Sequence, residues 1–438
     1  MKPTASTLVC AGCGWTAPSP EEMRYPFRCP KAVRGEADHV LTRKLDPFRV
    51  EFVQGDDPNP FIRHRQMLHS WHMARRRGLT DEAYVELVRR LDVAVAGVDG
   101  HGFRTTPFGR GDGLSDRLGF ESTGGVWVKD ETGNVAGSHK ARHLMGILLY
   151  LEVVERKERP PLAIASCGNA ALAAAVLARA AERPLRVFVP TDAEEAIVAR
   201  LVALGAEVTA CPRDPLIPGD PCLHRFHGAR ENGALPFCCQ GSENGLTIEG
   251  GETLADEMIT QMGETGLDHV VIQVGGGALA SAVIQAFRFA HRAGWVSQLP
   301  RFHTVQTQGA WPLKRAWDAV QEQLRISGEV AVLERATKHR AEFMRPWEET
   351  PHSVAHGILD DETYDWLAVV KGMLASRGSA IVVDEDLLRE ANALGRETTG
   401  LPVCHTGSAG LAGLMQLRRD GVIKPGERAA VIFSGRQR

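Results

Sequence analysis

Residues 162–211 read LAIASCGNAALAAAVLARAAERPLRVFVPTDAEEAIVARLVALGAEVTAC and alternate short apolar runs with longer stretches of helical spacing. The predicted strands are 162–166, 185–190 and 207–211, and the predicted helices between them are 170–182 and 196–206. Neighbouring strands that are joined by a crossover helix run parallel in one sheet. This stretch therefore predicts a parallel α/β sheet.

A second region of the same kind begins at the apolar run 269–274, continues with a helical pattern over 278–293 and ends with the strand 429–433. Two α/β domains are therefore predicted. The stretch 212–250 separates the two regions and is rich in Pro, Gly, Cys and His, so we expect it to be a loop that borders a cleft.

Composition excludes several classes of partner. The 438-residue chain has a formal net charge of −3, so it lacks the basic field that nucleic-acid binding usually needs. It contains no long apolar run and its first residues lack the order of a signal peptide, so we expect a cytoplasmic protein without a membrane partner. The 9 cysteines are odd in number and scattered, which indicates thiols or a metal site and not a disulfide framework.

The N-terminal segment 1–45 has a different character, with little hydrophobic periodicity and the residues Cys10, Cys13, Cys29 and His39. Cys10 and Cys13 form a Cys-x-x-Cys pair, and Cys29 and His39 would complete a tetrahedral zinc site. The second pair of ligands, Cys29 and His39, lacks the close spacing of a zinc ribbon. A zinc-knuckle-like segment and an irregular segment whose thiols cluster without a metal both fit this pattern.

Four features in the rest of the chain have the chemistry of an active site. Lys140 precedes apolar side chains at helical spacing, which predicts the first turn of an amphipathic helix, where a cation is unfavourable unless an anion is bound. Three further turns follow predicted strands, namely Ser166–Asn169, Gly275–Gly277 and Ser434–Gly435. Each feature alone also fits a solvated lysine, an ordinary turn or a tight strand-to-helix connection. Their order along the chain makes a functional site the better interpretation.

That order resembles the fold-type II pyridoxal-phosphate enzymes, the family of tryptophan synthase β chain, threonine synthase and serine/threonine ammonia-lyase, over roughly residues 100–438. The run Lys129-x-Glu131-x-x-Asn134-x-x-Gly137-Ser138-x-Lys140 is similar to the lysine motif of the family, which implies that Lys140 binds the cofactor covalently. By the same resemblance, Asn169 holds the ring hydroxyl and Ser434 meets the pyridine nitrogen. The phosphate loop would be Gly275, Gly276, Gly277, Ala278 and Leu279. His139 would help to hold the phosphate, or it is simply a packed histidine.

The resemblance also implies an architecture. It predicts an α/β protein with two parallel-sheet, three-layer domains of the tryptophan synthase β-like fold, preceded by the short cysteine-containing segment. We expect a large cofactor-binding domain from 46–134 and 256–438, and a small mobile domain from 135–255. The resemblance further implies a homodimer.

Three functions fit these features. The first is β-elimination or β-replacement on a small hydroxy or β-substituted amino acid, with Lys140 as the base that removes the Cα proton. The second is a threonine-synthase-like reaction on phosphohomoserine, which needs a further cationic pocket, for which Arg142 and His143 are candidates that are not diagnostic. The third is a catalytically quiet protein that holds a cofactor or zinc for a partner.

Cys167 lies in the turn that would face the cofactor opposite Lys140. A thiol there would either serve as a second acid or base, or act as a small inert side chain. We also expect zinc in the N-terminal segment to have no effect on the cofactor, because that segment precedes the residues that resemble the family.

Overall fold

The computed structural model describes residues 5–32, 37–155, 157–213 and 220–438, and over these residues the strands form sheets of six, four and two strands. The six-stranded sheet has the spatial order β11 (Ser379–Val383), β10 (Arg301–Thr307), β9 (His269–Gln273), β12 (Arg428–Phe433), β4 (Gly125–Asp130) and β3 (Phe108–Arg110). Its neighbouring strands are parallel except for β3, which pairs with β4 in the antiparallel sense at the edge of the sheet.

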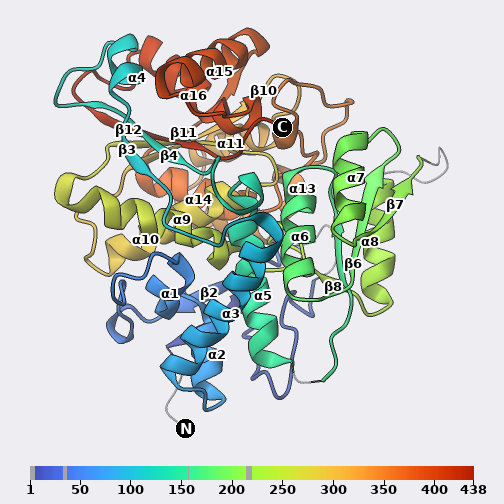
Figure 1. The fold of residues 1–438 in the computed structure, drawn as a ribbon. Coiled ribbons are helices and arrows are strands. Elements are labelled where there is room, and N and C mark those ends of the chain that lie inside the picture. Colours follow the sequence, from blue (N-terminus) through green and yellow to red (C-terminus); the bar gives the residue numbers. More distant parts are fainter. Residues whose placement is uncertain (1–4, 33–36, 156, 214–219) are drawn as a thin grey trace.

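Both faces of this sheet are covered by helices, so alternate residues of a strand enter two different cores. On β12, Ala430 and Ile432 enter one core, whereas Val431 and Phe433 enter the other. The first core is closed by α9 (Thr247–Met262), α10 (Ala278–Arg292), α11 (Pro312–Leu324), α12 (Glu329–Lys338), α13 (Arg340–Phe343) and α14 (Trp366–Ser376). The second is closed by α4 (Asp112–Arg117), α15 (Glu385–Thr399) and α16 (His405–Arg419), which lie above the sheet in Figure 1.

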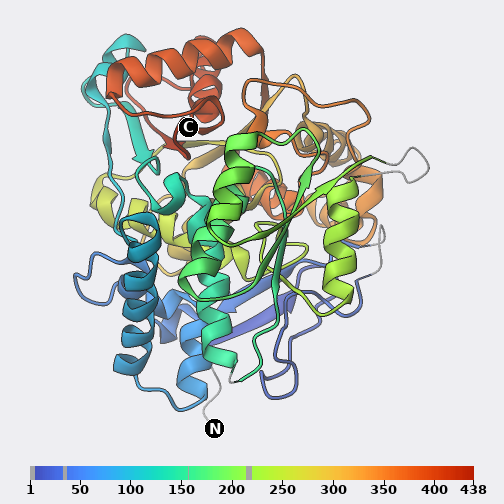
Figure 2. The ribbon, with the colours of Figure 1, turned by 45° about the vertical axis from the view of Figure 1, so that its right-hand side comes forward.

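The four-stranded sheet is wholly parallel and has the order β7 (Glu207–Cys211), β6 (Leu185–Pro190), β5 (Leu162–Ala165) and β8 (Leu235–Pro236). Its strands alternate with α6 (Asn169–Ala180), α7 (Glu195–Ala203) and α8 (Pro221–Glu231), which Figure 2 brings forward. The strands and helices predicted over 162–211 are therefore confirmed.

The predicted loop over 212–250 is wrong for much of its length, since it contains α8, β8 and the start of α9. Residues 214–219 of that stretch lie outside the described residues. The Asp220 side chain accepts a hydrogen bond from the Cys222 amide at 2.7 Å, and Pro221 occupies the first turn. This cap and proline start a helix in a sequence whose polar composition hides it.

Helix α5 (Lys140–Val154) begins at Lys140, as predicted, but the prediction that it is amphipathic is wrong. All of its side chains except those of Lys140 and Glu152 are buried, because α5 packs against α2 (His69–Arg76), α6 and α9. The helices α1 (Pro60–Arg63) and α3 (Asp81–Asp99) complete this region. A Cβ on Gly146 would lie 2.8 Å from Gly250 Cα, so the crossing of α5 and α9 requires glycine at this contact.

The N-terminal segment contains β1 (Ser6–Cys10) and β2 (Leu41–Leu45), which pair in the antiparallel sense. Strands β3, β4 and β9–β12 lie in the residue ranges predicted for the large domain, and β5–β8 lie in the range predicted for the small domain. Independent movement of the small domain stays a prediction. Among the described residues, no helix has the length and apolar character needed to cross a membrane.

Candidate active site

The start of α5 and the end of β12 lie side by side. Ser138 forms an antiparallel bridge with Gly435, and the His139 amide donates to the Ser434 carbonyl at 3.0 Å. Lys140 follows directly. Lys140 and Ser434 are separated by almost 300 positions in the chain, yet both therefore lie at the carboxyl edge of the six-stranded sheet. Open α/β sheets bind ligands at this edge.

The asparagine turn reaches the same place from the four-stranded sheet. Asn169 is the first residue of α6, and its Nδ2 lies 3.0 Å from the position that a Cβ on Gly435 would take. Asn169 Oδ1 accepts a hydrogen bond from Arg438 Nε at 3.1 Å, and the same guanidinium donates to the Ala136 carbonyl at 2.6 Å. Arg438 thus fixes the amide of Asn169 with its oxygen engaged and its N–H groups available to a ligand.

The glycine loop follows β9 and opens α10. Gly277 has φ of 95° and precedes Ala278 and Leu279, the first two residues of the helix. A Cβ on Gly275 would lie 2.8 Å from Ile358 Cα, and one on Gly276 would lie 2.9 Å from Tyr364 Cδ2. Glycine is therefore required by close packing as well as by backbone conformation. The N-terminus of α10 presents backbone amides of the kind that bind phosphate, and the Gly276 amide contacts the Asp360 carboxylate.

Ser434 receives a defined hydrogen bond from Gln273, the last residue of β9. Gln273 Nε2 lies 2.7 Å from Ser434 Oγ, 2.9 Å from the Gly407 carbonyl and 3.0 Å from the Ile432 carbonyl. Carbonyl oxygens only accept, so the atom that faces them must be the amide nitrogen, and Ser434 Oγ must accept from it. The hydroxyl proton of Ser434 is left to donate elsewhere.

Two buried polar atoms beside Lys140 have no partner among the described residues, namely Ser138 Oγ and His139 Nε2. His139 Nδ1 lies 3.0 Å from the Ser434 carbonyl, which requires a proton on Nδ1. Burial, assisted by the charge of Lys140, holds the pKa of His139 well below its usual value. Nε2 of the neutral ring therefore accepts a hydrogen bond, and it would donate to a phosphate only if that anion stabilised the imidazolium form.

A fully buried network of charges lies beneath the lysine. Arg142 makes bidentate contacts to Glu131 at 2.8 and 2.9 Å and to Glu257 at 2.8 and 3.0 Å. Lys129 Nζ donates to Glu257 at 2.5 Å and to the Thr106 carbonyl at 2.8 Å. Of the lysine-motif residues, Lys129 is therefore paired with Glu257 and Glu131 with Arg142 within the core. Arg142, considered above as a ligand for a substrate phosphate, is unavailable for that role.

His143 is also occupied by the protein. Its Nδ1 lies 2.8 Å from the Thr247 carbonyl, and its ring packs so closely on Gly251 that a Cβ there would lie 2.1 Å from Cε1. Burial lowers the pKa of His143 to about 3, so the ring is neutral. It does not supply the cation that a substrate phosphate would need.

Sequence reasoning missed the segment that closes the glycine loop. Asp360 lies so close to Gly275 that a Cβ on the glycine would meet its carboxylate, and burial raises the pKa of Asp360 against the opposing charge of Lys140. Thr363 Oγ1 donates to the Gly275 carbonyl at 2.8 Å. These residues follow no strand or helix pattern. Only the acidic run Asp360–Glu362 would have drawn attention to them.

Cys167 lies in the turn before Asn169, as predicted, with its side chain exposed. Desolvation, together with Asp192 and Asp220, raises the pKa of the Cys167 thiol. The thiolate is therefore disfavoured, which argues against Cys167 as a base, and the choice between an acid and an inert side chain stays a prediction.

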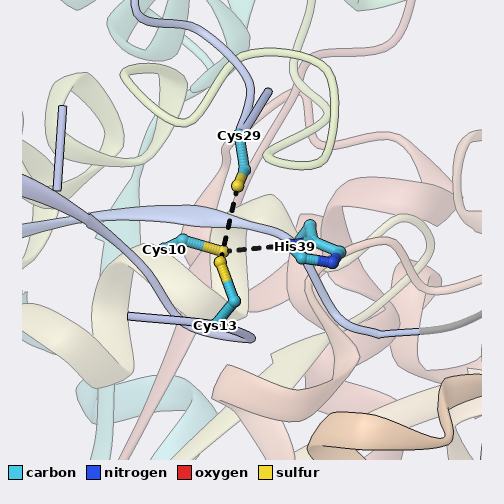
Figure 3. A group of neighbouring side chains, drawn as sticks. All are labelled: Cys10, Cys13, Cys29 and His39. Atoms are coloured by element: carbon cyan, nitrogen blue, oxygen red, sulfur yellow. Dashed lines mark hydrogen bonds between the residues drawn. The ribbon is translucent and has the colours of Figure 1, made fainter. Parts of the chain in front are cut away.

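The predicted metal ligands Cys10, Cys13, Cys29 and His39 come together in the N-terminal segment, and Figure 3 shows their side chains pointing toward one centre. Their ligand atoms all lie within 4.8 Å of one another. The structure thus brings together all four residues that the sequence could place only by spacing.

Comparisons with known proteins agree with this arrangement. Residues 101–435 match the family model described as "Pyridoxal-phosphate dependent enzyme". The chain is 26% identical over 311 residues to threonine synthase 2, chloroplastic, of Arabidopsis thaliana, which covers 70% of this chain and 55% of that protein. It is 24% identical over 337 residues to threonine synthase of Methanocaldococcus jannaschii, which covers 75% of this chain and 74% of that one. The chain therefore spans about half the length of the Arabidopsis relative.

Solved structures show the same fold. Threonine deaminase isoform 2 from Solanum lycopersicum superposes with a TM-score of 0.60 at 17% identity, covering 82% of this chain and 91% of that one. Maize serine racemase superposes with a TM-score of 0.58 at 18% identity, covering 80% of this chain and 92% of that one. The predicted fold class, an α/β protein of the tryptophan synthase β-like type, is confirmed.

Proposed function

This chain belongs to the family of pyridoxal-phosphate-dependent enzymes, and from that premise we propose that it catalyses β-elimination or β-replacement on a small hydroxy or β-substituted amino acid. The reaction would resemble that of a serine or threonine ammonia-lyase. The observation that supports this reading most strongly is the hydrogen bond from Gln273 to Ser434, 2.7 Å long.

The residues present fit the cofactor. The amides at the start of α10 would hold its phosphate, the N–H groups of Asn169 would hold an anionic ring hydroxyl, and Lys140 at the start of α5 would form the covalent link. The unpartnered Ser138 Oγ and His139 Nε2 supply further polar contacts in the same buried place. When bound, pyridoxal phosphate withdraws electrons from the substrate and so stabilises negative charge at Cα.

The Gln273 amide decides what Ser434 offers to the cofactor ring. Because Ser434 Oγ accepts from Gln273, its proton points outward and suits an unprotonated pyridine nitrogen. A ring held unprotonated withdraws electrons less strongly than a protonated one. Such a site favours loss or exchange of the β-substituent over transamination.

Lys140 is the residue that we propose to move the Cα proton. Its Nζ would take this proton once the substrate amine has replaced it, and could return a proton to the leaving group. The two carboxylates bound to Arg142 neutralise the nearby guanidinium, so the base does not work beside an unpaired cation. Asp360 and Asp365 are the acidic groups that act on Lys140 electrostatically.

A threonine-synthase-like reaction on phosphohomoserine is the second candidate. The names of the two curated relatives favour it, and the arginines near Asn169 give it a physical basis. Arg438 contacts Asn169, and the Arg436 side chain packs on Gly137, just before Lys140. With Arg142 and His143 occupied, these two arginines are the cations that we propose for a substrate phosphate.

A panel of amino acids separates the candidates. Release of keto acid from serine, threonine or a β-substituted analogue supports elimination, whereas conversion of phosphohomoserine to threonine and inorganic phosphate supports the second candidate. A protein that carries the cofactor yet changes none of these substrates would instead be the catalytically quiet binder. By resemblance we also propose a homodimer, which sedimentation of the purified chain would test.

A further inference from the structure

We propose that Cys10, Cys13, Cys29 and His39 bind one zinc ion, and that this ion stabilises the glycine loop Gly275–Gly277. The metal site stands on the geometry of the cluster alone. Its effect on cofactor affinity rests, in addition, on the proposed function of the glycine loop.

The distances within the cluster fit zinc. Cys13 Sγ and Cys29 Sγ are 3.7 Å apart, and Cys10 Sγ and His39 Nδ1 are 3.3 Å apart. In a tetrahedral site with Zn–S bonds of about 2.3 Å, two sulfur ligands lie about 3.8 Å apart. A disulfide would need about 2 Å, so the thiols are free to bind a metal. Three thiolates and one imidazole are ligands that zinc prefers in structural sites.

A metal would add to the stability of this segment. The core around the cluster consists of Cys10, Cys29 and Leu41 with the partly buried Trp15 packed against them. Such a small core contributes little burial energy, and segments of this size usually depend on a metal or disulfides. Cys10 ends β1 and His39 precedes β2, so one ion would join both strands to the chain around Cys29.

The cluster is connected to the stretch Gly241–Gly245, which leads from β8 toward α9. The Gly245 amide donates to the Phe27 carbonyl at 3.1 Å, and Arg28 Nε donates to the Ser242 carbonyl at 3.2 Å. Phe27 and Arg28 directly precede Cys29. A Cβ on Gly245 would lie 2.3 Å from the Leu41 carbonyl oxygen, so the backbone of β2 packs directly on this stretch.

A second set of contacts joins this stretch to the glycine loop. The Gly241 amide donates to Asp365 Oδ2 at 3.2 Å, and the Asp365 amide donates to the Gly276 carbonyl at 3.2 Å. Asp365 also lies against Gly277, where a Cβ would meet its side chain at 3.3 Å. The zinc ligands and the phosphate loop are thus connected through Gly241–Gly245 and one aspartate.

The coupling proposed from these contacts differs from the expectation from sequence that zinc and cofactor are independent. Loss of the ion would release Cys29 and the carbonyl of Phe27, and Gly241–Gly245 would lose the surface that holds it. The glycine loop would then sample more conformations, and a phosphate would have to order it again on binding. Coupling of this kind typically changes an affinity by five- to 150-fold, and we expect about tenfold here.

The test uses the full chain. Metal analysis of the purified protein should find about one equivalent of zinc, and a strong chelator or the substitution Cys13→Ser should remove it. Hydrogen exchange should then rise in 241–245 and 275–278, and the Kd for pyridoxal phosphate should rise about tenfold. Zinc chloride should restore the low hydrogen exchange and the lower Kd in the stripped protein, but not in Cys13→Ser.

Two further variants make the result specific. Cys222→Ser alters a buried cysteine outside the cluster and should retain zinc and the protection of both segments. Arg28→Ala should keep zinc but raise hydrogen exchange in 241–245, because it removes a contact between the cluster and that stretch. Native protein without zinc would overturn the metal site. Unchanged exchange at 275–278 after zinc removal would overturn the coupling, whether or not the protein binds the cofactor.

Discussion

Replacing Arg142 by methionine should destabilise the protein strongly. The guanidinium is fully buried and contacts two carboxylates, those of Glu131 and Glu257. With Lys129 included, the cluster holds two cations and two anions. Arg142→Met fills most of the volume but leaves one buried negative charge without compensation, which costs about 3–5 kcal/mol of unfolding free energy.

The loss of unfolding free energy in Arg142→Met should depend on pH in a defined direction. Burial alone would raise the pKa of Glu257, yet Arg142 and Lys129 together lower it to about 2. An acid with a depressed pKa stabilises the fold above its unfolded value of about 4.5, and this stabilisation is lost as the pH falls toward 2. In Arg142→Met, Glu257 keeps only Lys129 as a cationic partner, so the Glu257 carboxyl protonates more readily. The difference in unfolding free energy between wild type and variant should therefore be largest near pH 7 and should decrease below about pH 5.

Urea unfolding of both proteins at pH 7 and pH 4.5 measures this gap. Arg419→Met is the matched control, because Arg419 also binds a glutamate with two contacts, at 2.7 and 2.9 Å to Glu390, but both side chains are more than half exposed. We expect at most about 1 kcal/mol for the control. A loss below about 1 kcal/mol in Arg142→Met, or a gap that does not change with pH, would refute the account of the network.

Three other predictions follow from single sites. Gly276→Asp should strip the cofactor from the purified protein, because a carboxylate would face the phosphate and its Cβ would meet Tyr364; unchanged cofactor content would argue against the phosphate loop. Cys167→Ala should keep elimination within about tenfold, and a collapse of several orders of magnitude with cofactor bound would show that the thiol is a second base. Burial lowers the pKa of His303, which lies 3.0 Å from His269, to about 3, so stability should fall as the pH drops below about 6.5. Between pH 7 and pH 5 wild type should lose about 2 kcal/mol more than His303→Gln, and equal losses in urea titrations would contradict this.

The sequence predicted the fold well where its periodicity was strong. The strands and helices over 162–211 could be located because apolar runs, glycine and polar turns alternate there without ambiguity. Helix α5 was misjudged because a helix that is buried on all sides shows no polar face, and its burial depends on α2, α6 and α9, which are distant in sequence. Helix α8 was missed because its start depends on a capping aspartate and not on hydrophobic spacing.

The candidate site divides in a similar way. Lys140, Asn169, Gly275–Gly277 and Ser434 could be proposed because each follows a strand or begins a helix, and the order of such ends along the chain is informative. Arg438 and Asp360 could not be proposed, since their roles arise from contacts with residues hundreds or tens of positions away. The use of Arg142 within the core was hidden for the same reason. A charged residue near an active-site lysine suggests a ligand contact until its partners are known.

The identity of the lysine that binds the cofactor tests the central claim most directly. Purified protein incubated with pyridoxal phosphate and then reduced with borohydride should carry the cofactor on Lys140 when its peptides are mapped by mass spectrometry. Lys140→Ala should show no attachment while its circular dichroism and urea midpoint stay near those of wild type, because Lys140 makes the first turn of α5 without being part of the buried network. Attachment to another lysine, or none in the wild-type protein, would contradict the account.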